Sequence, residues 1–136
     1  MATGTKILVV DDEAIILGLL TSFLGGSGFE VFIASGGRQA LAFLETHPEI
    51  DVVLSDVQMP GMNGWEFWME LHKIQSPLIR RFIFMSGAIS DDSLLRSVQY
   101  SGCRFLQKPF LNLAKVAQEC TLASMSVSRS WEAITT

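Results

Sequence analysis

The chain has 136 residues, of which 49% are hydrophobic, and this length and composition suit one domain with a sizeable core. Its 10 lysines and arginines against 14 aspartates and glutamates give a net charge of −4, which offers no basic footprint, so we expect no direct nucleic acid binding. The sequence shows no signal-peptide pattern and no apolar run long enough to span a membrane, so we expect a cytoplasmic protein without membrane binding.

Short apolar runs alternate with helical patterns along the whole chain. The first run, Ile7 to Val10, ends abruptly at Asp11-Asp12-Glu13 and predicts a buried strand. Apolar residues at helical spacing predict a helix from Ala14 to Leu24, and Gly25-Gly26 follows as a stop signal. The alternation continues with strand 29–34, helix 37–45, strand 52–55, helix 65–73, strand 82–86, helix 92–100, strand 104–106 and helix 111–124.

This order of elements predicts the fold class. Strands that are apolar throughout and separated by helices favour a parallel sheet covered on both faces, because a strand with one wet face would alternate apolar and polar residues. We therefore predict an α/β fold with a doubly wound, five-stranded parallel sheet and five helices. The domain is expected to span residues 1–124, and residues 125–136 form a polar C-terminal tail that is expected to fray.

Polar side chains stand at the ends of four predicted strands. Asp11 and Asp12 follow the first, Asp56 follows the third, Ser86 ends the fourth and Lys108 follows the fifth. Ligands of open parallel sheets bind at this edge, so we expect these groups to converge. Three carboxylates there would raise one another's pKa unless a cation neutralised them, and an all-oxygen site suits Mg²⁺. A carboxylate nucleophile, an ammonium group and a hydroxyl complete the parts needed to hold a phosphoryl group.

Four motifs in this order resemble those of response-regulator receiver domains. They are "VVDDE", "LSDVQMPGMNG", "FMSG" and "FLQKPF", and the resemblance covers the chain roughly from Lys6 to Ala123. It implies a flavodoxin-like sheet with strand order 2-1-3-4-5. It also implies that Asp56 accepts a phosphoryl group from a histidine kinase or a histidine phosphotransfer protein. The last two motifs look most like receivers attached to hybrid histidine kinases.

The resemblance further implies a set of residue roles. Mg²⁺ would be bound by Asp12, Asp56 and the backbone carbonyl of Gln58, with Asp11 contributing through water. Lys108 would contact the acyl phosphate, and Ser86 would reorient to bind it. Phe105 matches the aromatic switch position, and the peptide bond between Lys108 and Pro109 would be cis. Such a module catalyses its own phosphorylation and dephosphorylation and signals to a downstream protein by a change of its surface.

Each of these residues also has a purely structural interpretation. Asp11 or Asp12 can cap the helix that follows, because a carboxylate accepts backbone N–H groups. Lys108 can be a surface lysine, and Ser86 can be a small residue in a tight turn before Gly87. A phenylalanine at position 105 has no hydroxyl group for a switching hydrogen bond and can be part of the core.

Two other classes of protein remain open from the residues alone. The first is a phosphohydrolase or phosphotransferase such as the haloacid dehalogenase-like enzymes. In those enzymes the nucleophile ends the first strand in an Asp-x-Asp pattern, whereas here the first strand ends in adjacent acids. The second is a degenerate receiver that binds partners without phosphorylation, which the complete set of acids, serine and lysine argues against.

The predicted first helix and the residues that follow it, from Ala14 to Phe29, contain no charged residue. We expect Ile16, Leu19, Leu20 and Phe23 to form its buried face, which leaves Ile15 and Leu17 over. Leu17 is expected to be at least partly exposed, with Gly18 beside it allowing close approach of another helix. Scattered surface leucines are ordinary. The functional alternative is that Ile15, Leu17 and Gly18 form a docking surface for the phosphoryl donor.

Overall fold

The computed structural model describes residues 4–126, and every predicted strand and helix is present in the predicted order with ends shifted by at most two residues. The 3-10 helix η1 was not predicted. The elements are β1 (Lys6–Val10), α1 (Ala14–Gly26), β2 (Glu30–Ala34), α2 (Gly37–Glu45), β3 (Val52–Asp56), α3 (Gly64–Lys73), η1 (Pro77–Arg80), β4 (Phe82–Ser86), α4 (Asp92–Ser101), β5 (Arg104–Gln107) and α5 (Leu113–Ser124). Of the predicted tail, only residues 125 and 126 fall within the described part.

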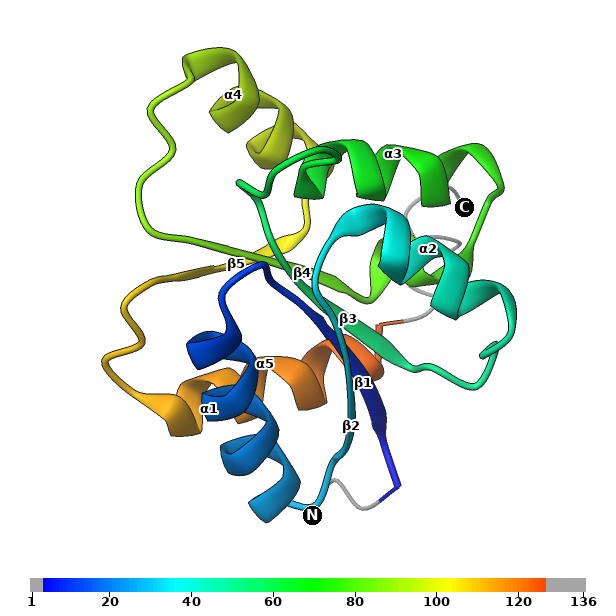
Figure 1. Ribbon diagram of the computed structural model, residues 1–136, viewed down its shortest axis with the longest axis vertical. Coiled ribbons are helices and arrows are strands. Elements are labelled where there is room, and N and C mark those ends of the chain that lie inside the picture. Colours follow the sequence, from blue (N-terminus) through cyan, green and yellow to red (C-terminus); the bar gives the residue numbers. More distant parts are fainter. Residues whose placement is uncertain (1–3, 127–136) are drawn as a thin grey trace, which may run out of the picture.

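The five strands form one parallel sheet in the order β2-β1-β3-β4-β5, which confirms the predicted fold (Figure 1). Strands β1, β3 and β4 lie inside the sheet, and β3 and β4 are buried along their whole length. Successive side chains point to opposite faces of the sheet, so an interior strand needs apolar residues at every position.

Helices cover both faces of the sheet and define two apolar layers (Figure 1). On one face, α1 and α5 pack against alternate strand residues; the buried side chains there include Ile7, Val9, Leu20, Leu24, Leu54, Ile83, Val116 and Cys120. On the other face lie α2, α3 and α4, with Leu8, Val10, Ala40, Val53, Phe67, Leu71, Phe84 and Val98 among the buried residues.

The buried face of α1 differs from the prediction. Leu17 is buried with Leu20 and Leu24, whereas Leu19 is 41% exposed. The prediction that Leu17 is exposed is therefore wrong. Residues at i, i+3 and i+7 share one face of a helix, and this alternative stripe of leucines is the one that contacts the sheet.

Helical spacing in α3 predicts that Trp65, Trp68 and Leu71 lie in the core. Leu71 is buried, but the fully buried aromatic residue is Phe67, which packs against Phe82. Trp65 and Trp68 are only partly buried and stack on each other at the edge of the core, where the indole N–H of Trp68 donates to the carbonyl of Ile79 at 3.2 Å. An indole at the periphery keeps its N–H satisfied, which full burial beside apolar side chains would prevent.

Among the helices within residues 4–126, none has both the length and the apolar character needed to cross a membrane.

Candidate functional site

Three carboxylates meet at the carboxyl edge of the sheet. Asp11 and Asp12 follow β1, Asp56 ends the neighbouring β3, and one oxygen from each lies within 4.8 Å of the others. Asp11 is fully buried and Asp56 is 6% exposed, whereas Asp12 is exposed to solvent. Because parallel strands all end at the same edge, residues 45 positions apart in the sequence come into direct proximity. The structure therefore brings together the three acids that the sequence singled out.

Lys108 places its ammonium group among these acids. Its Nζ lies 2.6 Å from Oδ2 of Asp11 and 3.5 Å from Oδ2 of Asp56, and the lysine side chain is 12% exposed. The backbone N–H of Lys108 donates to the carbonyl of Ser86 at 2.8 Å, which fixes the end of β5 against β4. The following peptide bond, to Pro109, is cis, the isomer that the resemblance implies. Lys108 is thus a largely buried ion-pair partner and not a surface lysine.

Glu13 is a fourth acid at this edge that the sequence interpretation did not single out. Its carboxylate lies 3.5 Å from Nζ of Lys108 and is largely exposed. Its backbone N–H donates to Oδ1 of Asp11 at 2.9 Å, so Asp11 holds the start of α1 with one oxygen and Lys108 with the other. The available signal was the third consecutive acid in "DDE".

The cluster contains more negative than positive charge. Burial raises the pKa of Asp56 from its ordinary value of 3.8 to about 6, repulsion from Asp11 adds to the rise, and the charge and hydrogen bond of Lys108 partly oppose it. Burial alone would lower the pKa of Lys108, but its hydrogen bond to Asp11 and the neighbouring carboxylates outweigh burial and raise it. Several carboxylates therefore share one ammonium group, and an excess of negative charge remains at this edge.

Ser86 lies at the end of β4 with its side chain turned toward the loop after β3. It is buried, and its hydroxyl lies 3.4 Å from Oε1 of Gln58, a weak hydrogen bond. Gln58 was predicted to contribute its backbone carbonyl to the metal site, and this side-chain contact was not foreseen. The hydroxyl of Ser86 is therefore held only weakly, by an exposed side chain.

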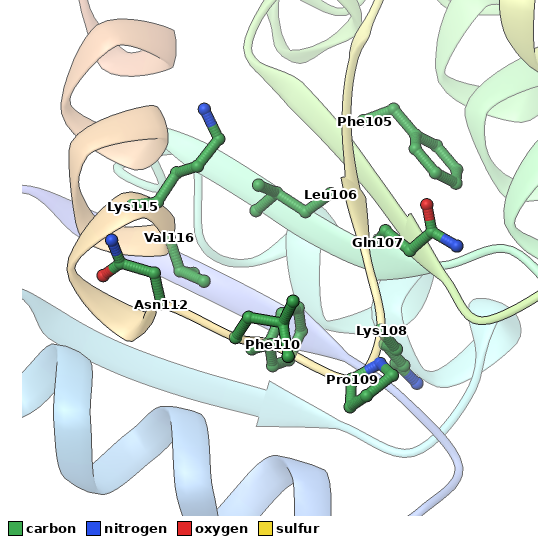
Figure 2. A pocket seen from close by; sticks show the side chains of 10 residues that line it. Phe105, Leu106, Gln107, Lys108, Pro109, Phe110, Asn112, Lys115 and Val116 are labelled. Carbon is green, nitrogen blue, oxygen red and sulfur yellow. The ribbon is translucent and has the colours of Figure 1, made fainter.

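Phe105 is 41% exposed and is not part of the core. Figure 2 shows its ring on the side of β5 opposite to Leu106, which is 5% exposed. A pocket of about 560 Å³ runs along β5, the turn after it and the first turn of α5, and Figure 2 shows the side chains that line it. Lys108 lines this pocket as well as the acidic cluster, so the two adjoin.

The loop after β3 is held close to the end of that strand. The backbone N–H of Gly64 donates to the carbonyl of Val57 at 2.8 Å, and a Cβ atom at Gly64 would lie 2.3 Å from the carbonyl oxygen of Asp56. Asn63 and Glu66 form a capping box that starts α3 at this point. Glycine is thus the only residue that fits here without displacing the backbone of Asp56.

The residues predicted for partner docking are only partly available. Ile15 is 85% exposed and Gly18 is exposed, but Leu17 belongs to the core. Leu19 is exposed in its place and lines a hollow of about 440 Å³ between α1 and α5, together with Phe23 and Leu113. Helix α1 therefore does present an apolar surface, which contains Leu19 in place of Leu17.

Comparison with known proteins gives one consistent result. The family model for the response regulator receiver domain matches residues 7–119. Two-component response regulator ARR14 of Arabidopsis thaliana is 34% identical over 79% of this chain and 28% of its own length. Transcriptional regulatory protein CpxR of Klebsiella pneumoniae is 34% identical over 83% of this chain and 47% of its own length. The chain thus spans less than half the length of these curated relatives.

Solved structures resemble the whole fold. A response regulator receiver domain protein from Clostridium thermocellum superimposes with a TM-score of 0.76 at 29% identity, over 88% of this chain and 94% of that one. The receiver domain of a signal transduction histidine kinase from Syntrophus aciditrophicus gives a TM-score of 0.75 at 27% identity, over 89% and 91% of the two chains.

Proposed function

This chain belongs to the response regulator receiver domain family of two-component systems, and on that basis we propose that it accepts a phosphoryl group on Asp56. The observation that carries the proposal is the position of Asp56, a nearly buried carboxylate 3.5 Å from the ammonium of Lys108 at the carboxyl edge of the sheet. The phosphoryl donor is a histidine kinase or a histidine phosphotransfer protein. This chain works in the cytoplasm and passes its signal to a downstream protein.

In the proposed step, an oxygen of Asp56 attacks the phosphorus of a phosphohistidine. A new O–P bond forms, the N–P bond breaks, and the imidazole leaves with the electron pair of that bond. Lys108 already lies beside the attacking oxygen, so its charge stabilises the negative charge of the phosphoryl group without a large rearrangement. Hydrolysis of the acyl phosphate by water would return the free carboxylate, so the chain needs no second substrate.

The donor atoms of the cluster fit Mg²⁺. The site offers only oxygen ligands, two from buried acids and one from the exposed Asp12, and the exposed side leaves positions for water. We propose Asp12, Asp56 and the backbone carbonyl of Gln58 as direct ligands, and Asp11 as a ligand through water. When bound, the ion would neutralise charge on the carboxylates and on the phosphoryl oxygens.

Phosphorylation by a small donor tests this proposal. Incubation with acetyl phosphate and Mg²⁺ should add one phosphoryl group by intact mass, and peptide mapping should place it on Asp56. Chelation of the metal should reduce the adduct by at least about tenfold, because the acids would again repel the incoming anion. An adduct on a serine or histidine, or one indifferent to the chelator, would refute the assignment.

We further propose that Ser86 and Phe105 form the switch. Ser86 is held only by a 3.4 Å contact to Gln58, so its hydroxyl can turn toward a phosphoryl group on Asp56, and the ring of Phe105 can follow into the vacated space. Because Phe105 has no hydroxyl group, the ring itself would signal by its position.

Replacing Ser86 with Ala tests the switch. Labelling of Asp56 should persist, but the change in hydrogen exchange of α4 and β5 on phosphorylation should largely disappear. Ser90→Ala, a change at an exposed serine of the next loop, is the matched control. An unchanged exchange response in Ser86→Ala would show that this serine does not transmit the signal.

The docking surface is proposed to consist of Ile15, Gly18 and Leu19, without Leu17. Ile15→Glu should slow phosphotransfer from the cognate kinase by about tenfold while leaving acetyl phosphate labelling intact, since a charge on the helix would disfavour an apolar contact. Ile74→Glu replaces another exposed isoleucine, 71% exposed against 85% for Ile15, at the opposite end of the molecule and should change neither rate. Equal losses in both assays for Ile15→Glu would contradict docking.

A further inference from the structure

A second apolar hollow lies at the amino ends of the strands, far from the acidic cluster. We call it the α2–α3 groove. It has a volume of about 490 Å³ and lies between α2, the loop before β3, the end of α3 and η1. Helices α2 and α3 pack side by side here (Figure 1). The apolar side chains that line the groove are Leu41, Leu44, Ile50, Leu71, Ile74 and Leu78.

The groove is open, and part of its apolar lining faces solvent. Ile74, which ends α3, is 71% exposed. An exposed isoleucine alone is ordinary, but here it continues into a hollow lined by leucines from three different elements. Burial of this surface by another apolar group would be favourable.

The described chain ends at the rim of this groove. Arg81 lines the groove, and its Nε–H donates to the carbonyl of Ser126 at 3.0 Å. This bond joins residues 45 positions apart and carries the chain from the end of α5 to the side of the molecule where α2 and α3 lie. Residues 127–136 therefore start beside the groove.

The sequence of residues 127–136, "VSRSWEAITT", supplies suitable apolar groups. Its large apolar residues, Val127, Trp131 and Ile134, recur at intervals of four and three, the spacing that favours one helical face lying in a groove. Trp131 lies five residues after Ser126 and can reach up to about 17 Å from it, whereas two packed helices are about 8–10 Å apart.

Charges along the two surfaces are also complementary. Glu45 lies on the groove and makes no ion pair within residues 4–126. Arg129 lies between Ser126 and Trp131 in the sequence, so it passes near this rim whenever the indole reaches the groove.

We propose that residues 127–136 bind in the α2–α3 groove of their own chain, with the indole of Trp131 covering Leu44 and Ile74. Helix α5 packs on one face of the sheet, and α2 and α3 pack on the other. The bound segment would therefore connect the two faces past the amino ends of the strands. The surface formed by α4, β5 and α5 stays uncovered. The contact is independent of phosphorylation at Asp56.

Nuclear magnetic resonance of the full chain tests the proposal. The indole N–H signal of Trp131, identified by its loss in Trp131→Phe, should show nuclear Overhauser contacts with methyl groups of Leu44 and Ile74. Ile74→Asp should move that signal to the position of a solvent-exposed indole. Ile15→Asp changes an exposed isoleucine on α1 and should leave it in place. Amide spectra check that both variants keep their fold.

A chain ending at Ser126 gives an independent readout, because its amide signals should shift around the groove and not along α1. A Trp131 signal already at the exposed position in the unchanged protein would overturn the proposal. Contacts that vanish on dilution, together with a dimer in sedimentation, would also overturn it, because the occupant would then be a second copy.

Discussion

Replacing Asp56 with Asn is expected to abolish phosphorylation and to stabilise the metal-free protein at neutral pH. The loss of labelling follows because an amide has no carboxylate oxygen with which to attack phosphorus. The gain in stability follows from the raised pKa of Asp56, since the folded protein must hold a charged carboxylate in a buried position beside Asp11.

The direction of the pH dependence follows from the raised pKa. In the unfolded chain Asp56 loses its proton near 3.8, whereas in the folded protein it keeps the proton up to about pH 6. Between these values the folded state binds more protons, so the free energy of unfolding decreases as the pH rises. A rise in pKa from 3.8 to about 6 corresponds to roughly 3 kcal/mol, and this destabilisation is complete above the upper value.

Thermal unfolding in the presence of a chelator measures this effect. Asp56→Asn should unfold roughly 10 °C higher than the unchanged protein at pH 7.5, and the difference should vanish near pH 4. Added Mg²⁺ should stabilise the unchanged protein more than the variant and so narrow the gap. Equal stability of the two proteins at pH 7.5 without metal would mean that Asp56 is not destabilised by its surroundings.

Much of the fold was predictable because interior strands of a parallel sheet have a recognisable pattern in the sequence. Runs such as Ile7 to Val10 are apolar at every position and end at an acid, and no other arrangement suits them so well. The convergence of Asp11, Asp56 and Lys108 followed from the same topology, since all parallel strands end at one edge.

The orientation of α1 was not predictable because the helix has no charged residue to mark its exposed side. Two apolar stripes, one through Ile16 and Leu19 and one through Leu17 and Leu24, differ by only about 100° of rotation. Contacts with the sheet select the second stripe. The role of Glu13 was likewise hidden, because its distance to Lys108 depends on the direction of the first turn of α1.

Gly64→Ala adds one methyl group, and we expect it to be the most damaging addition of this size near the site. The new Cβ atom would lie 2.3 Å from the carbonyl oxygen of Asp56 and 3.0 Å from the Cα atom of Val57. Both neighbours are backbone atoms of a buried strand end, so no side chain can move aside to make room. Either α3 must retreat from β3, breaking the hydrogen bond from Gly64 to Val57, or the end of β3 must shift.

Both movements are costly, and both disturb Asp56, the proposed phosphoryl acceptor. We expect the free energy of unfolding to fall by about 3 kcal/mol or more, as for overpacking against parts that cannot yield. Because the displaced carbonyl belongs to Asp56, the surviving folded protein should also be labelled more slowly by acetyl phosphate.

Gly25→Ala is the matched control: that glycine lies in α1 with nothing within 4 Å of the added carbon. It should be neutral or stabilise the protein by up to about 1 kcal/mol, because alanine favours helix more than glycine does. If chemical denaturation shows Gly64→Ala to be as stable as Gly25→Ala, the close approach of α3 to the acceptor strand is not a constraint on this fold.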